Sequence, residues 1–159
     1  MKIYVIVALC ITISPIINAQ KSIHRYEPIE NFDDGEITLF SFPDEDEDSE
    51  MWVLDSVNTY NESPFSLKLY GNTWKTETVE PVIIDSGDVW QIAVYTESIG
   101  EIQGFALMDS INVLFYSFSG SETLDIDVWV TVYQGAFFPG QWNLIQLPIA
   151  DDWSARFDY

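Results

Sequence analysis

From Ile29 onward, the chain consists of short runs rich in Val, Ile, Thr, Phe, Tyr and Trp that alternate with turn-forming residues. No window keeps a helical period for three turns, and short β-branched and aromatic runs between turns are typical of strands. The pattern predicts eight strands, over residues 36–42, 51–57, 65–71, 89–97, 102–108, 113–118, 126–134 and 142–149. Because the connections are short, we expect an all-β fold, an antiparallel two-sheet β-sandwich.

Polar and apolar residues alternate along three of these strands. Successive side chains on a strand point to opposite faces, so the apolar set is expected to face the core. The core-facing set comprises Phe65, Leu67, Leu69, Trp90, Ile92, Val94, Ile126, Val128, Val130 and Val132. The opposite faces carry Ser66, Lys68, Tyr70, Gln91, Ala93, Tyr95, Asp127, Trp129, Thr131 and Tyr133.

The first nineteen residues have the order of an export signal: a basic start at Lys2, an apolar run over residues 3–13, and a small residue, Ala19. Pro15 and Asn18 end the apolar run too early for a membrane anchor. We therefore expect cleavage after Ala19, a secreted or cell-surface location, and no membrane insertion afterwards.

The segments that follow are residues 20–28, a short lead-in, and residues 29–159, a single domain. Trp153, Phe157 and Tyr159 are large groups for a chain end. They favour either a chain that continues past Tyr159 or a complete domain on which the last aromatic residues dock.

The formal net charge is −20, and all 26 acidic residues follow Ala19. Such a charge repels nucleic acids and anionic membranes, which leaves neutral ligands and cations. Residues 44–48 are all acidic, and two interpretations stay open: a solvated loop, or a calcium loop that lacks the usual glycine. The only cysteine, Cys10, lies in the leader, so the mature chain has no disulfide.

Residues 29–35 (IENFDDG) and 63–71 (SPFSLKLYG) together resemble the opening strand and a following segment of galactose-binding-like jelly-roll domains of secreted bacterial proteins. This family contains many carbohydrate-binding modules, so the resemblance implies jelly-roll topology and a glycan or polysaccharide partner. It also implies a structural calcium ion with Asp33 or Asp34 as a ligand. From the residues alone, a turn with two solvated carboxylates is the alternative.

Sugar binding in water uses flat aromatic rings flanked by polar groups, and the outward faces of the predicted strands carry both. The candidate ligand-binding residues are Trp129, Tyr133, Tyr95, Gln91, Lys68, Tyr70 and Asn72. The alternative is that these aromatic rings form a second hydrophobic layer beneath loops.

The sequence offers few candidate catalytic residues. Asp125 and Asp127 weakly resemble the acidic motif of laminarinase-like hydrolases, but the glutamates of that motif are missing. The only histidine, His24, lies in the lead-in segment, so no His-based triad is available in the domain. The sequence therefore favours a non-catalytic carbohydrate-binding module. A structural or adhesive surface protein and a sandwich-fold glycoside hydrolase are the alternatives.

Overall fold

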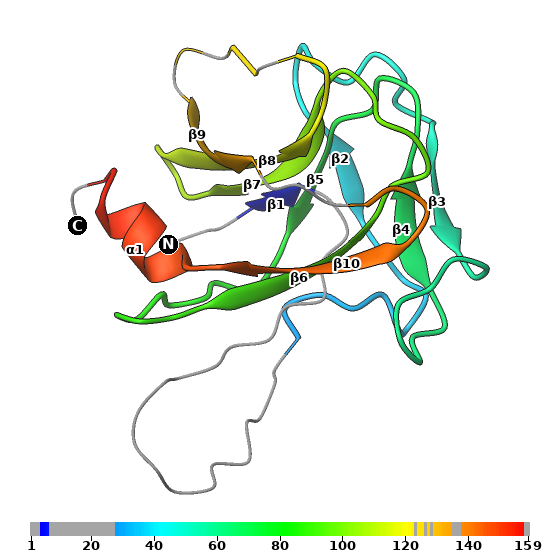
Figure 1. The fold of residues 1–159 in the computed structure, drawn as a ribbon, viewed down its shortest axis with the longest axis horizontal. Helices are drawn as coiled ribbons and strands as arrows, with labels where there is room; N and C mark the ends of the chain where they lie inside the picture. The colour runs from blue at the N-terminus through cyan, green and yellow to red at the C-terminus, as the bar shows by residue number, and fades with distance from the viewer. Residues whose placement is uncertain are drawn as a thin grey trace, which may run out of the picture.

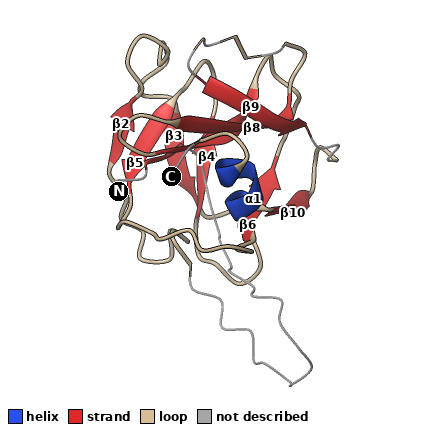
Figure 2. Ribbon diagram, turned by 90° about the vertical axis from the view of Figure 1, so that its left-hand side faces the viewer, coloured by secondary structure: helices blue, strands red, loops and turns tan. Residues whose placement is uncertain are grey.

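The computed structural model describes residues 4–6, 28–122, 124–125, 127, 129–134 and 138–157, and for residues 4–6 and 130–134 the backbone alone. It is mostly β, with one short helix near the C-terminal end of the described chain (Figures 1 and 2). The elements are β1 Tyr4–Ile6, β2 Leu39–Ser41, β3 Trp52–Asp55, β4 Ser66–Leu69, β5 Lys75–Thr78, β6 Trp90–Tyr95, β7 Gln103–Met108, β8 Val113–Ser119, β9 Trp129–Gln134, β10 Trp142–Leu147 and α1 Ile149–Ser154.

All eight predicted strands are confirmed in position: each overlaps one of β2, β3, β4, β6, β7, β8, β9 and β10. Three elements were not predicted. Strand β5 has no apolar alternation, α1 is only six residues long, and β1 falls inside the predicted export leader.

The described strands form three sheets: a six-stranded sheet with the order β2-β5-β1-β7-β8-β9, a β6–β10 ribbon and a β3–β4 ribbon. The pairs β3–β4 and β7–β8 are antiparallel hairpins between consecutive strands, as the short connections predict. One pair departs from the expected antiparallel arrangement, because β8 and β9 run parallel.

The main core lies between the β6–β10 ribbon and strands β7 and β8, as the two layers of Figure 1 suggest. Trp90 and Ile92 of β6 meet Phe105 of β7 and Tyr116 of β8, and all four side chains are fully buried. The rings of Phe105 and Tyr116 stack with their centroids 5.3 Å apart. The predicted burial of Trp90 and Ile92 is therefore confirmed.

Strict alternation fails in two of the predicted strands. Ser66 is as buried as Leu67, at 8% and 7% exposure, and Ala93 is buried beside Ile92. The Ser66 hydroxyl donates a hydrogen bond to the Asn58 carbonyl at 2.7 Å, so this polar side chain is satisfied where it is buried. Ile126 and Val128 lie outside the described residues, as do the side chains of Val130 and Val132.

Helix α1 docks on the main core. Trp153 is 1% exposed, and Phe157 packs against it with ring centroids 4.7 Å apart. The Tyr116 hydroxyl donates a hydrogen bond to Asp152 Oδ2 at 2.9 Å, and burial together with this carboxylate raises the pKa of Tyr116. The expectation that the last aromatic residues dock on the β layers is thus confirmed for Trp153 and Phe157.

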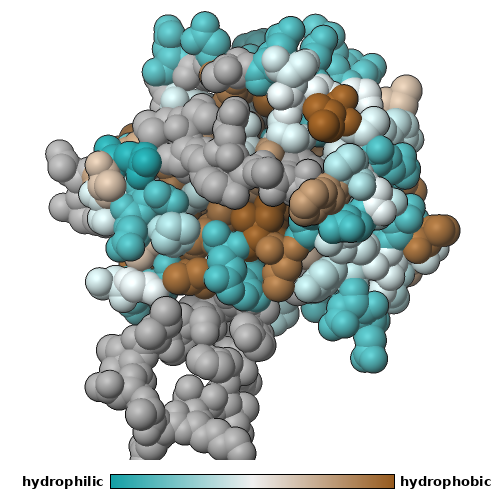
Figure 3. Space-filling model, in the orientation of Figure 1, coloured by the Kyte–Doolittle hydropathy of each residue, from teal (hydrophilic) through white to brown (hydrophobic). Residues whose placement is uncertain are grey.

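The described surface carries both hydrophilic and apolar side chains. Among the coloured atoms of the face in Figure 3, hydrophilic residues predominate, and an apolar area lies near the centre. Within the described ranges, no helix has the length and apolar content needed to span a bilayer.

Candidate functional site

A cleft of about 400 Å³ lies where β4 and the turn after it face the ends of β6 and β7. This volume is within the range of small-molecule sites. The structure brings five of the seven predicted ligand-binding residues to its lining: Lys68, Tyr70, Asn72, Tyr95 and Trp129.

One wall of the cleft is aromatic. Tyr95 of β6 lies directly opposite Trp142 of β10 in the antiparallel ribbon, with ring centroids 5.7 Å apart. Tyr60 packs edge-on against Trp142 at 5.4 Å and supports that ring. Tyr95 and Trp142 are half-buried, so part of each is accessible at the cleft. Trp142 was not among the predicted residues, because it opens its strand and has no apolar alternation beside it.

Trp129 contributes to the interior of the cleft. It is 8% exposed and packs against Phe42, Trp74 and Phe115, with centroids 5.2, 6.1 and 5.7 Å away. The prediction that Trp129 points away from the core is therefore wrong, because a second buried cluster covers that face of β9. Trp74 and Phe115 also line the cleft, so this cluster forms its apolar base.

The acidic run of residues 44–48 lies behind the turn that follows β4, and the prediction of a solvated loop is wrong for two of its members. Asp48 Oδ2 accepts the Asn72 N–H at 2.7 Å, and the Asp48 N–H donates to the Asn72 carbonyl at 3.0 Å. Asp46 Oδ1 accepts the Trp74 N–H at 2.9 Å. These bonds fix the backbone of residues 72–74, which line the cleft.

Gly71 is required in the turn that follows β4. Its φ of 72° is in the left-handed region, and a Cβ there would lie 2.5 Å from Asp48 Oδ2. The turn can therefore come close enough to the acidic run to form the Asp48–Asn72 bonds only without a side chain at residue 71.

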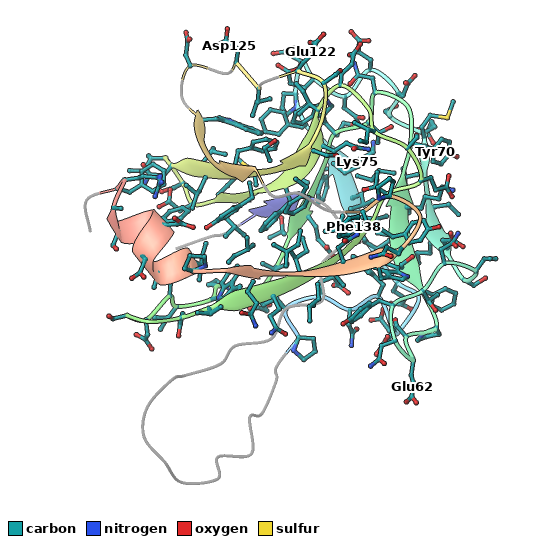
Figure 4. The ribbon with its side chains drawn as sticks, in the orientation of Figure 1. Glu62, Tyr70, Lys75, Glu122, Asp125 and Phe138 are labelled. Carbon is teal, nitrogen blue, oxygen red and sulfur yellow. The ribbon has the colours of Figure 1, made fainter. Side chains whose placement is uncertain are left out.

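A buried ion pair anchors the acidic run. Lys75 Nζ lies 2.5 Å from Asp46 Oδ2, with side chains 4% and 1% exposed (Figure 4 labels Lys75). Lys75 also donates to Ser41 Oγ at 3.2 Å and to the Ser49 carbonyl. Burial alone would raise the pKa of Asp46, but hydrogen bonds from Lys75, Ser41 and Trp74 outweigh it and lower that pKa.

The rim of the cleft is polar. Lys68 Nζ and Glu97 Oε1 form an ion pair of 2.7 Å between β4 and the residues after β6, and the hydrogen bond to Glu97 raises the pKa of Lys68. Asp55 lines the same region, and hydrogen bonds from Val57 and Asn58 lower its pKa. Lys68 is the only basic residue among the described residues that line the cleft, and Glu97 already neutralises its charge.

Two predicted residues are not shown in the cleft. Gln91 is half-buried in β6 and is absent from the lining, so its predicted place beside Tyr95 at the ligand site is not supported. Tyr133 belongs to β9, but its side chain lies outside the described residues. Its role stays a prediction.

Asp33 and Asp34 lie on an exposed turn after the buried Phe32. Asp33 accepts a hydrogen bond from the Ser63 hydroxyl at 2.6 Å, and Asp34 accepts the Glu36 N–H at 2.9 Å. Among the residues that the structure describes, no three His, Cys, Asp or Glu side chains are grouped to hold a metal ion. The calcium site stays a prediction.

Asp125 and Asp127 are both exposed and precede β9, which begins at Trp129. Figure 4 shows Asp125 projecting from the loop before that strand. Neither residue lines the cleft.

Comparison with known proteins found no family model, no curated protein and no solved structure that matches the chain. The resemblance to galactose-binding-like domains therefore stays a prediction from residues 29–35 and 63–71.

Proposed function

We propose that this chain is an exported, non-catalytic carbohydrate-binding module and that its glycan lies in the cleft. The observation that carries the proposal is that the cleft joins accessible aromatic rings, Tyr95 and Trp142, with polar groups at its rim. Flat rings pack against the apolar faces of pyranoses, while amide and charged groups bond the hydroxyls. Tyr95 and Trp142 stack on the sugar ring, and Lys68 and Asn72 form hydrogen bonds with the sugar hydroxyls.

The fold that accompanies this function is a two-sheet sandwich of jelly-roll topology. It is supported by the main core, which lies between the β6–β10 ribbon and strands β7 and β8. The two resembling segments also meet: Ser63 Oγ bonds Asp33, at the start of the domain.

The expected ligand is a neutral glycan. The chain carries a net charge of −20, the cleft contains Asp55 and Glu97, and Lys68 is neutralised by Glu97. Uronic acids and sulfated sugars would meet repulsion there, which salt would weaken. Export as a secreted or surface protein, directed by residues 1–19, is consistent with a polysaccharide partner.

A glycan screen tests the proposal. Purified protein would be titrated with neutral and uronate-containing oligosaccharides, and the best neutral ligand then compared across Trp142→Ala, Tyr95→Ala and Phe40→Ala. Phe40 is 55% exposed and lies outside the cleft, so it is the matched aromatic control. We expect each cleft variant to bind about tenfold more weakly or worse, since a stacking ring contributes roughly 1.4 kcal/mol or more, and Phe40→Ala to bind normally.

Circular dichroism melts would confirm that all three variants fold. Failure of every glycan to bind the folded protein, or equal losses in Phe40→Ala and the cleft variants, would refute the carbohydrate site.

A further inference from the structure

Strand β1 occupies a position between β5 and β7 and is antiparallel to both. Its pairs are Tyr4↔Thr78 and Val5↔Glu77 on one side, and Tyr4↔Met108, Val5↔Leu107 and Ile6↔Ala106 on the other. In the described sheet, β1 is what joins the β2–β5 half to the β7–β8–β9 half (Figure 1).

The inference depends on the export proposal above, because Tyr4–Ile6 lies within the leader that cleavage after Ala19 would remove. Its removal takes the hydrogen-bonding partners away from one edge of β5 and one edge of β7. Unpaired strand edges of this kind accept an added strand. The space left between them, bounded by Glu77–Thr78 and Ala106–Met108, is named the strand slot here.

We propose that the strand slot of the mature protein binds an extended segment of another polypeptide in the position that β1 holds. Directly opposite residues of neighbouring strands share a face of the sheet. The central residue of the incoming strand therefore lies on the face that carries Leu107, a fully buried member of the main core. An apolar central residue is required there.

The negative charge around the strand slot favours basic residues on either side of the central residue of the partner strand. Burial raises the pKa of Glu77 to about 7, with further contributions from Glu30 and Asp34 nearby. A Lys or Arg two residues from the apolar centre shares the face of Glu77 and would relieve this repulsion between carboxyl groups. Two copies of this strongly acidic chain repel each other, so a basic partner strand is favoured over a second copy.

The first step of the test is the intact mass of the exported protein, which must show a chain that starts at Gln20. The probe is a labelled synthetic peptide of residues 2–7 that carries Ile3→Lys and Val7→Lys, and its control carries Val5→Pro as well. Proline lacks an N–H and disrupts a strand ladder. We expect saturable binding of the probe, at least tenfold weaker binding of the control, and slowed amide exchange in β5 and β7.

Matched charge reversals test the role of the carboxyl groups. Glu77→Lys should weaken the probe at least tenfold, whereas Glu122→Lys, an exposed site away from the slot (Figure 4), should not. Equal binding of probe and proline control, or no protection in β5 and β7, overturns the proposal. Self-association with the same protection would assign the slot to a second copy instead. A retained leader would refute both the export proposal and the open slot, whereas a correctly cleaved protein that ignores the probe would refute the slot alone.

Discussion

Replacing Lys75 with methionine should destabilise the fold strongly, because it removes one partner of a buried ion pair. The ammonium group has three acceptors, on Asp46, Ser41 and Ser49, while the Asp46 side chain is only 1% exposed. Methionine keeps the apolar stem of the lysine side chain. The loss of stability therefore measures the effect of removing the ammonium charge. Removing one member of such a pair costs about 3–5 kcal/mol, since the other charge stays buried. For a domain of this size, that corresponds to a fall of roughly 10–20 °C in Tm.

Urea unfolding followed by tryptophan fluorescence at pH 7 would measure the loss, with a midpoint expected about 2 M lower. Asp46 has a lowered pKa in the folded protein, so its pairing stabilises the fold above the ordinary aspartate pKa of 3.8, and this stabilisation is lost as the pH falls. In Lys75→Met this carboxyl group is instead expected to take up a proton more readily. The difference in the free energy of unfolding between Lys75→Met and wild type should therefore become smaller towards about pH 4.

The control is Lys68→Met, which removes an exposed ion pair with Glu97 and should leave the midpoint nearly unchanged. A Lys75→Met protein that unfolds at the same urea concentration as wild type at pH 7 would refute the reasoning.

Two further substitutions test the packing around the cleft and the helix. In Gly104→Ala, the new Cβ would lie 2.2 Å from the Tyr116 carbonyl oxygen and 2.6 Å from the Phe115 ring, so urea unfolding should show a loss of about 1–3 kcal/mol. Gly100→Ala, whose nearest neighbour is Gln103 at 3.8 Å, should change stability little, and equal effects of the two would contradict the predicted clash. Trp153→Ala should cost about 3–5 kcal/mol in the same assay, because this ring is 1% exposed in the main core. The exposed Ser154→Ala in the same helix should be nearly neutral, and a mild effect at Trp153 would show that α1 is not part of the core.

Strand positions could be predicted because alternation and turn residues are local signals. Strand β5 could not, since its first residue, Lys75, is buried through a tertiary ion pair with Asp46 that no local pattern shows. Likewise, the alternation of apolar and polar residues along β9 predicted Trp129 outside the core. A local pattern does not show the buried cluster that covers that face of the strand. Long-range packing decided both cases.

The candidate site was predictable in composition but not in geometry. Aromatic and polar residues on outward faces identified Tyr95 and Lys68, which the structure places in one cleft. Trp142 was missed because its role depends on the β6–β10 pairing. The support that residues 44–48 give to the cleft depends on bonds to a segment about 25 residues later.

The most direct test of the carbohydrate proposal is a crystal structure of the protein with the neutral oligosaccharide that binds best in the screen. The account predicts a sugar ring in the cleft, stacked on Tyr95 or Trp142, with its hydroxyls bonded to Lys68 or Asn72. A glycan bound elsewhere on the surface, with the cleft empty at saturating ligand, would contradict it.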